Sequence, residues 1–242
     1  MTIRSLQGSD APLAVLFDLD NTLADRDRAF LDWARWFAQT RLGLTQEPAV
    51  DAAVRVMIDL DAEGRTTKDE FFSALKDRYS SLSGDTITLA AAFRPQLLAH
   101  LPPLSENAAC LLDALDAALV PWGIVTNGSA SQVHKVEKLG LANQAACIVI
   151  SEKVGARKPD PAIFRAGAAG LGIAPSHILF VGDHPESDIV GAAQAGMRTA
   201  WLRRGREWPA AHVTTSPDVI VDALDELLWL AEGRGQGGTA QK

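Results

Sequence analysis

Short apolar runs alternate along the chain with longer segments whose apolar residues recur at helical spacing. Five runs, each bounded by Gly, Asn or Asp turns, predict buried strands: LAVLF (13–17), WGIVT (122–126), CIVI (147–150), ILFVG (178–182) and TAWL (199–202). Helical patterns separate the later runs, in ASQVHKVEKLGL, PDPAIFRAGAAGLG and SDIVGAAQAG. This alternation predicts an α/β fold in which right-handed crossover helices cover both faces of a parallel sheet.

The interval between the first two predicted strands carries helical patterns alone. Amphipathic spacing recurs in RAFLDWARWFAQTRLGL, PAVDAAVRVMIDLDAEG, KDEFFSALKDRYSSL, TLAAAFRPQLLAHL and ENAACLLDALDAAL. We therefore predict a Rossmann-like core domain from residues 1–24 and 99–232, with a helical domain inserted at 25–98. TSPDVIVDALDELLWLAEG closes the core as a short strand and a helix, and the Gly-rich segment 233–242 is expected to be a flexible tail.

The composition narrows the class of protein. Of the 242 residues 47% are hydrophobic and 22% charged, and the formal net charge is -7, which argues against general binding to nucleic acid or to anionic membranes. The sequence has no signal-peptide pattern and no apolar run long enough to span a bilayer, so we expect a cytoplasmic enzyme or binding protein. Cys110 and Cys147 lie in apolar runs and are expected to be two buried thiols in a reducing compartment.

Polar side chains follow several of the predicted strands, at the edge where a parallel α/β sheet binds ligands. They are Asp18, Asp20 and Thr22 after the first strand, Thr126, Asn127, Gly128 and Ser129 after the second, Lys158 after the third, and Asp183, Glu186 and Asp188 after the fourth. Each one alone can be explained as a turn former, a helix cap or a surface residue. Together they bring several carboxylates, one lysine, and hydroxyl and amide groups to one edge.

The chemistry of this group of side chains points to a metal and a phosphate. Neighbouring carboxylates raise one another's pKa, and a hard divalent cation such as Mg²⁺, which prefers oxygen ligands, relieves that repulsion. Lys158 and the backbone N–H groups at helix N-termini are suited to a phosphate. The sequence therefore predicts a site for Mg²⁺ and a phosphate beside a carboxylate that can attack phosphorus.

Four segments resemble, in order, the four motifs of the haloacid dehalogenase superfamily. They are FDLDNTL, VTNGS, GARKPDPAIF and VGDHPESD, and the matching region extends from Phe17 to Gly196. KPDP and GDHPESDIVGAAQAG resemble in particular the helical-cap branch (C1, subfamily IA) that contains phosphatases. The resemblance implies that the inserted helices form the cap domain.

The resemblance implies a role for each motif carboxylate. Asp18 would be the nucleophile that forms an aspartyl-phosphate, and Asp20 would be the general acid and base. Mg²⁺ would be held by the carboxylates of Asp18 and Asp183 and the backbone carbonyl of Asp20. Asp188 would support the metal directly or through water.

The remaining motif residues would hold the phosphate or shape the site. Thr126, the backbone N–H of Asn127 and Lys158 would bind the phosphate oxygens. Thr22 is expected to shape the loop after the nucleophile, and Gly182 to let the backbone approach the metal site closely.

The resemblance implies Mg²⁺-dependent hydrolysis of a small phosphomonoester, of the nucleotide or sugar-phosphate type, through an aspartyl-phosphate. Dehalogenases of this family typically lack an acid at the position of Asp20 and need no metal, so Asp20 and Asp183 argue against a dehalogenase reaction. Phosphonate hydrolases use a cap lysine, whereas Lys68 and Lys76 lie in charged helical segments that predict a solvated face. A phosphomutase of the β-phosphoglucomutase type stays open, although mutases usually carry DFDG where this chain has DLDN. A non-catalytic binding or regulatory protein on the same scaffold is the other alternative.

The sequence leaves the substrate and the oligomeric state open. The polar cap residues that could contact a substrate are not ranked by the sequence: Arg26, Arg28, Asp59, Asp61, Arg65 and Arg94. The cap aromatic residues recur at helical spacing and are expected to form the core of the cap: Trp33, Trp36, Phe37, Phe71 and Phe72.

Overall fold

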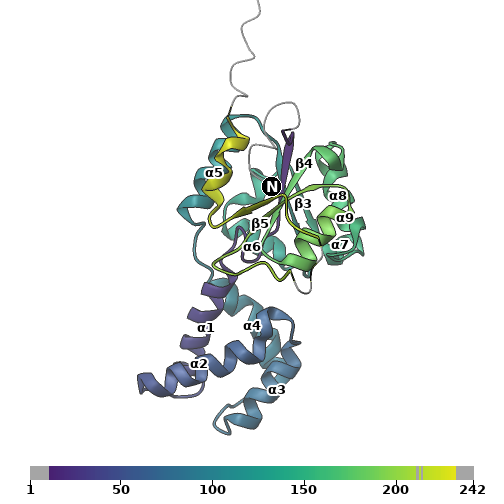
Figure 1. Cartoon of the computed structure of the whole chain (residues 1–242). Helices are drawn as coiled ribbons and strands as arrows, with labels where there is room; N and C mark the ends of the chain where they lie inside the picture. Colours follow the sequence, from purple (N-terminus) through teal and green to yellow (C-terminus); the bar gives the residue numbers. More distant parts are fainter. Residues whose placement is uncertain (1–10, 211–212, 214, 233–242) are drawn as a thin grey trace, which may run out of the picture. The chain divides into compact units, whose positions relative to one another are not determined.

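The computed structural model describes residues 11–210, 213 and 215–232, and in it the chain divides into two compact units (Figure 1). Met1–Ala24 with Pro103–Lys242 form one, which we call the sheet unit, and Asp25–Pro102 form the other, which we call the helical unit. The segment 233–242, predicted to be a flexible tail, lies outside the described residues.

The sheet unit is built on six parallel strands in the order β3-β2-β1-β4-β5-β6. The strands are β1 (Ala14–Phe17), β2 (Trp122–Thr126), β3 (Cys147–Ile150), β4 (Ile178–Gly182), β5 (Arg198–Leu202) and β6 (Val219–Val221). The predicted Rossmann-like parallel fold is thus confirmed. Because the chain moves outward from β1 in one direction and from β4 in the other, the carboxyl ends of these two strands form the switch point where such sheets bind ligands.

The strands next to the switch point are fully buried, as expected for a parallel sheet covered on both faces. On one face Leu16, Val125 and Phe180 pack with Phe164 of the helix α8 (Pro161–Leu171). Gly167 of α8 makes this close packing possible, because a Cβ there would lie 2.8 Å from Leu16 Cδ1. The sheet and its helices therefore hold the ends of β1 and β4 firmly.

Helices flank the sheet, with α5 and α8 on opposite sides of it (Figure 1). Besides α8 they are α5 (Glu106–Ala117), α6 (Gln132–Lys138), α7 (Ser151–Val154) and α9 (Gly191–Gln194), the 3₁₀ turns η4 (Leu141–Asn143), η5 (Pro175–His177) and η7 (Leu224–Leu230), and the π-helical turn η6 (Pro185–Val190). Two segments differ from the expected α-helices: SDIVGAAQAG is divided between the π-helical η6 and the α-helical α9, and the closing helix is 3₁₀. The wide η6 turn carries Asp188, whose carboxylate accepts a hydrogen bond from the backbone N–H of His184 at 2.9 Å.

The expectation of two buried thiols is wrong. Cys110 is exposed and Cys147 is half-buried. The apolar stripe of α5 consists of Ala108, Leu111, Leu112 and Leu115, and Cys110 lies outside it. An apolar run in an amphipathic helix therefore does not imply that each member is buried.

The helical unit is held together by aromatic side chains. Its helices are α1 (Arg26–Thr40), α2 (Glu47–Asp61), α3 (Lys68–Arg78) and α4 (Thr86–Ala99), with the 3₁₀ turn η3 (Ala62–Gly64). Trp33 lies at the centre, with its ring 4.9 Å from that of Phe37 and 4.8 Å from that of Phe93. Four of the five predicted core aromatic residues are buried, and Trp36 is half-buried. No helix within 11–210 or 215–232 is both long and apolar enough to cross a bilayer.

A buried carboxylate forms the polar centre of the helical unit. Asp61 accepts hydrogen bonds from Arg26 at 2.5 Å and from Lys68 at 2.6 Å. Lys68 also lies over the rings of Phe71 and Phe93, so the solvated face expected for this lysine is wrong. The contacts of Arg26 and Asp61 give these two cap candidates a structural role, since each is paired inside the unit.

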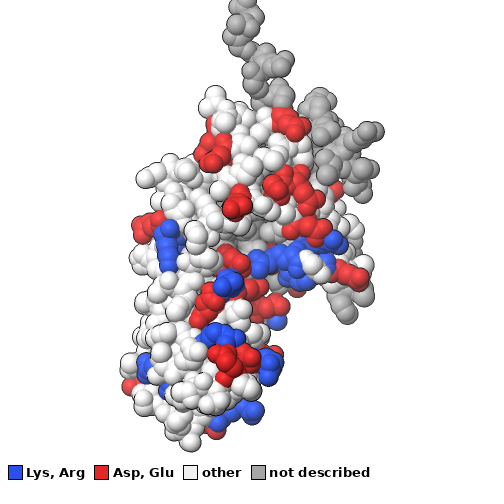
Figure 2. Space-filling view, turned by 90° about the vertical axis from the view of Figure 1, so that its left-hand side faces the viewer, with Lys and Arg blue, Asp and Glu red and all other residues white. Residues whose placement is uncertain are grey.

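Ion pairs also connect exposed side chains of the helical unit. Arg35 contacts Glu47 at 2.7 Å and Asp51 at 2.6 Å, and thereby joins α1 to the start of α2. Figure 2 shows Lys and Arg side chains next to Asp and Glu side chains on the face that it draws. Such exposed pairs contribute only about 0–1 kcal/mol each to the free energy of unfolding.

Candidate active site

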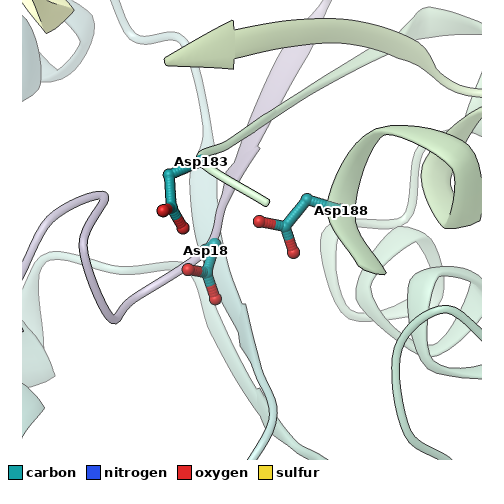
Figure 3. A group of neighbouring side chains, drawn as sticks. All are labelled: Asp18, Asp183 and Asp188. Atoms are coloured by element: carbon teal, nitrogen blue, oxygen red, sulfur yellow. The ribbon is translucent and has the colours of Figure 1, made fainter. Parts of the chain in front are cut away.

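Three buried carboxylates meet at the switch point of the sheet (Figure 3). Asp18 follows β1, Asp183 follows the neighbouring β4, and Asp188 comes from η6. One oxygen atom of each carboxylate lies within 4.8 Å of those of the other two. The backbone N–H of Asp18 donates to the carbonyl of Val181 at 2.9 Å, so the parallel pairing of β1 and β4 continues to the point where the acids begin.

Lys158 lies against two of these carboxylates. Its Nζ is 2.5 Å from Asp18 Oδ1 and 2.7 Å from Asp188 Oδ1, and the residue is 4% exposed. The loop that follows α7 thus places Lys158 in contact with Asp18 and Asp188.

Asn127 fixes the backbone of Lys158 with its side chain. Asn127 Oδ1 accepts a hydrogen bond from Lys158 N at 2.8 Å, and Asn127 Nδ2 donates to Lys158 O at 3.0 Å. The sequence interpretation assigned only the backbone N–H of Asn127 to the site. The side chain therefore has a second function, which is to connect the end of β2 to the lysine loop.

The charges of the site explain the pKa values of its groups. Burial raises the pKa of Asp18 well above its ordinary range, and while Lys158 opposes this increase, Asp188 and Asp183 add to it. Burial likewise raises the pKa of Asp183 to about 6, and Asp188 adds to the increase while Arg206 opposes it. For Lys158, burial lowers the pKa, but the carboxylates of Asp18 and Asp188 outweigh this effect and raise it.

These residues fit a hard divalent cation such as Mg²⁺. Three buried carboxylates from three segments lie close enough to share one ion, and burial together with their mutual repulsion raises the pKa values of Asp18 and Asp183. A bound cation would relieve the repulsion that Lys158 and Arg206 offset only in part.

Gly182 and Thr22 shape this group of acids. A Cβ at Gly182 would lie 2.5 Å from Asp188 Oδ2, so only glycine leaves room for the third carboxylate. Thr22 is buried, and its hydroxyl donates to Asp18 Oδ2 at a long distance of 3.5 Å. Gly182 thus makes room for Asp188, and Thr22 lies beside Asp18.

Asp20 lies apart from the three buried acids, and its side chain is 25% exposed. Its carboxylate contacts Lys135 of α6 at 2.5 and 2.8 Å and accepts a hydrogen bond from Gln132 at 2.9 Å. Gln132 also donates to Thr126 Oγ1 at 2.9 Å, which connects Asp20 to the end of β2. The sequence interpretation missed Gln132 and Lys135, although the helical pattern after VTNGS placed them three residues apart on one face.

Arg206 is a third residue that the sequence interpretation missed. Its Nη2 donates to the backbone carbonyl of Asp183 at 2.7 Å and to Asp183 Oδ2 at 2.9 Å. Trp201 Nε1 of β5 donates to the same carbonyl at 2.8 Å. No motif marks Arg206, which follows β5 in an irregular segment, and only the fold brings it to Asp183.

Three further loop residues hold the loops around the site, and His184 contacts an acid through its backbone N–H, which donates to Asp188. His184 caps η6, because its Nδ1 accepts a hydrogen bond from Ser187 N at 3.2 Å, and Glu186 is exposed. The hydroxyl of Ser129 pairs with that of Ser131 at 2.7 Å. These residues shape the loops after β4 and β2.

Comparison with known proteins identifies the family. The family model described as haloacid dehalogenase-like hydrolase matches residues 12–196. The chain is 30% identical to the glyceraldehyde 3-phosphate phosphatase of Methanopyrus kandleri over 89% of this chain and 95% of that protein. It is 33% identical to the pyrimidine 5'-nucleotidase YjjG of Escherichia coli over 88% of this chain and 95% of that protein.

A solved structure supports the same assignment. The HAD-hydrolase YfnB from Bacillus subtilis, whose crystal structure contains bound magnesium, is similar with a TM-score of 0.72 and 25% sequence identity. The match covers 90% of this chain and 98% of that chain. The chain belongs to the haloacid dehalogenase superfamily of hydrolases, in its subfamily IA phosphatase branch.

Proposed function

We propose that the protein is a Mg²⁺-dependent phosphatase that hydrolyses a small phosphomonoester through a phosphorylated Asp18. The observation that carries this proposal is the buried group of Asp18, Asp183 and Asp188 in contact with Lys158, with Asp20 two residues after Asp18. The relatives named as a glyceraldehyde 3-phosphate phosphatase and a nucleotidase support a sugar-type or nucleotide substrate. A cytoplasmic location is part of the same proposal.

The residues divide the reaction into two steps. An oxygen of the Asp18 carboxylate attacks phosphorus, the bond from phosphorus to the leaving oxygen breaks, and Asp20 gives its proton to that oxygen. Water then attacks the phosphorylated Asp18 and loses a proton to Asp20, and the bond between phosphorus and the Asp18 oxygen breaks to release inorganic phosphate. Lys158 and Thr126 bind phosphate oxygens throughout.

The acids of the site would hold Mg²⁺ from the first step of this reaction. Asp18, Asp183 and the carbonyl of Asp20 would be the ligands, with Asp188 as direct or water-mediated support. The ion supplies positive charge that favours the ionised form of Asp18 and offsets the charge of the phosphoryl group.

The test is phosphate release from p-nitrophenyl phosphate, acetyl phosphate and a panel of sugar phosphates and nucleoside monophosphates, with Mg²⁺ and with EDTA. We expect turnover with Mg²⁺ that EDTA abolishes, and loss of at least about 10³-fold in the rate with Asp18→Asn, since no nucleophile remains. Circular dichroism of the Asp18→Asn variant checks that it is folded. The proposal fails if no member of the panel releases phosphate in a metal-dependent way. Interconversion of sugar phosphates with little free phosphate would indicate a mutase instead.

A further inference from the structure

We propose that Gln132 and Lys135 of α6 are positioning residues, which hold the carboxylate of Asp20 at the place where it exchanges protons with the leaving group and with water. This inference rests on the proposed phosphatase function and assigns to α6 a part in it. Neither residue belongs to the motifs that located the site, and both donate to Asp20 rather than to the motif acids Asp18, Asp183 and Asp188 in the hydrogen bonds described below.

Lys135 contacts both carboxylate oxygens of Asp20. Its Nζ lies 2.5 Å from Oδ1 and 2.8 Å from Oδ2, and the two side chains are 16% and 25% exposed. Exposed ion pairs are loosely held and contribute little, whereas this pair is mostly shielded from water. The two contacts therefore restrict the orientation of the Asp20 carboxylate.

Gln132 connects Asp20 to the predicted phosphate site. Its Nε2 donates to Asp20 Oδ2 at 2.9 Å and to Thr126 Oγ1 at 2.9 Å, and it lies 3.3 Å from the carbonyl of Asn127. Gln132 is 5% exposed and Thr126 is 1% exposed. One buried amide therefore sets the separation between the acid and base group and a residue that would bind the phosphate.

The path of the backbone supports this buried placement. A Cβ at Gly128 would lie 2.7 Å from Gln132 Cγ, so the turn after β2 leaves space for the glutamine side chain. Gln132 and Lys135 are three residues apart in α6, which places them on the same face of the helix. A purely structural ion pair would not explain why one carboxylate receives donors from both residues while Thr126 shares one of them.

The two steps of the reaction use Asp20 differently, and this gives the proposal a specific test. The leaving oxygen of p-nitrophenyl phosphate departs readily without a proton, whereas that of phenyl phosphate needs the proton of Asp20. The ratio kcat/KM reports the transfer to Asp18, while kcat also includes hydrolysis of the phosphorylated enzyme, which needs Asp20 as base. A misplaced Asp20 should therefore lower kcat/KM for phenyl phosphate and leave kcat/KM for p-nitrophenyl phosphate nearly unchanged.

The experiment measures both substrates with Mg²⁺ for the wild type, Lys135→Met and Gln132→Leu. We expect each variant to lose about 10- to 100-fold in kcat/KM for phenyl phosphate, a fraction of the full contribution of general acid catalysis. For p-nitrophenyl phosphate, kcat and KM should fall together. Lys135→Arg keeps a cationic donor and should restore much of the lost rate. Lys138→Met removes an exposed lysine of the same helix and serves as the charge-matched control.

The outcomes separate this inference from the proposed function. Equal losses for the two substrates, or no loss for either, would overturn the positioning role, because lost folding or phosphate binding affects both substrates alike. Melting curves identify a variant that is unfolded. If Lys135→Met is unfolded, the kcat/KM values of Lys135→Arg for the two substrates decide instead. Absence of Mg²⁺-dependent turnover in the wild type would overturn the phosphatase function and this inference with it.

Discussion

Each acid in the site contacts a cationic side chain, and these pairings divide the carboxylates by role. Asp18 and Asp188 contact Lys158, Asp183 contacts Arg206, and Asp20 contacts Lys135. The buried acids therefore share incompletely neutralised charge, which suits a metal, while Asp20 is held separately at the edge. These cationic neighbours are what the structure adds to the sequence interpretation, because Lys135 and Arg206 come from segments without a motif.

Arg206 should control the pH range in which the site binds Mg²⁺. Burial raises the pKa of Asp183 to about 6, and Arg206 opposes that increase, so removal of the guanidinium should raise this pKa further. Because the ion binds the ionised carboxylate, the apparent affinity should fall by about tenfold for each pH unit below that pKa. In Arg206→Gln the fall should therefore begin at a higher pH than in the wild type.

Isothermal titration with MgCl₂ over a series of pH values measures this shift without any substrate. Arg203→Gln is the matched control, because Arg203 lies in the same segment but pairs with Asp222. An identical pH dependence in Arg206→Gln and the wild type would show that Arg206 has no influence on Asp183.

At the scale of elements, the close approach of α8 to the sheet supports the loops that carry Lys158 and Asp188. Gly167 faces Leu16 of β1 and Val125 of β2, and a Cβ there would lie 2.8 Å from a carbon of each. Gly167→Ala should therefore push α8 outward and lower the free energy of unfolding by about 1–3 kcal/mol. Helix propensity alone would give the opposite sign, a gain of up to about 1 kcal/mol.

Urea unfolding followed by circular dichroism decides between these two signs. A variant more stable than the wild type would mean that a methyl group fits between α8 and the sheet at this position. A loss of stability with intact Mg²⁺ binding would show that the packing of the helix and the geometry of the acids are separable.

For the whole molecule, the regular parts of the fold followed from the sequence and the side-chain contacts did not. Short apolar runs between helical patterns predicted the ends of β1 to β5 to within one residue, since strands buried on both faces are continuously apolar. Because parallel sheets bind ligands at the carboxyl ends of their strands, the sequence also predicted that Asp18, Asp183 and Lys158 lie at one edge of the sheet. The exposure of Cys110 and the pairing of Lys68 with Asp61 depend on which face a helix turns inward, and short sequence windows do not determine this.

Metal binding should stabilise the sheet unit, because its ligands come from chain positions far apart that fold into one site. Asp183 makes this testable through stability. Its pKa rises from an ordinary value of 3.8 to about 6 in the folded protein. The folded state therefore binds the proton more tightly than the unfolded chain, so the free energy of unfolding decreases as the pH rises from 3.8 to about 6. Above that window the ionised, metal-free Asp183 costs about 2–3 kcal/mol.

Asp183→Asn should consequently melt at a higher temperature than the wild type in EDTA at about pH 8, since the amide avoids the cost of a buried charge. With Mg²⁺ the order should reverse, because the wild type gains about RT ln(1 + [Mg²⁺]/Kd) and the variant, which has lost a ligand, gains much less. Melting curves with EDTA and with MgCl₂ test both statements, and Asp222→Asn, an exposed carboxylate outside the site, provides the control. A variant that melts lower than the wild type in EDTA and gains as much from Mg²⁺ would show that Asp183 neither carries the cost of burial nor binds the ion.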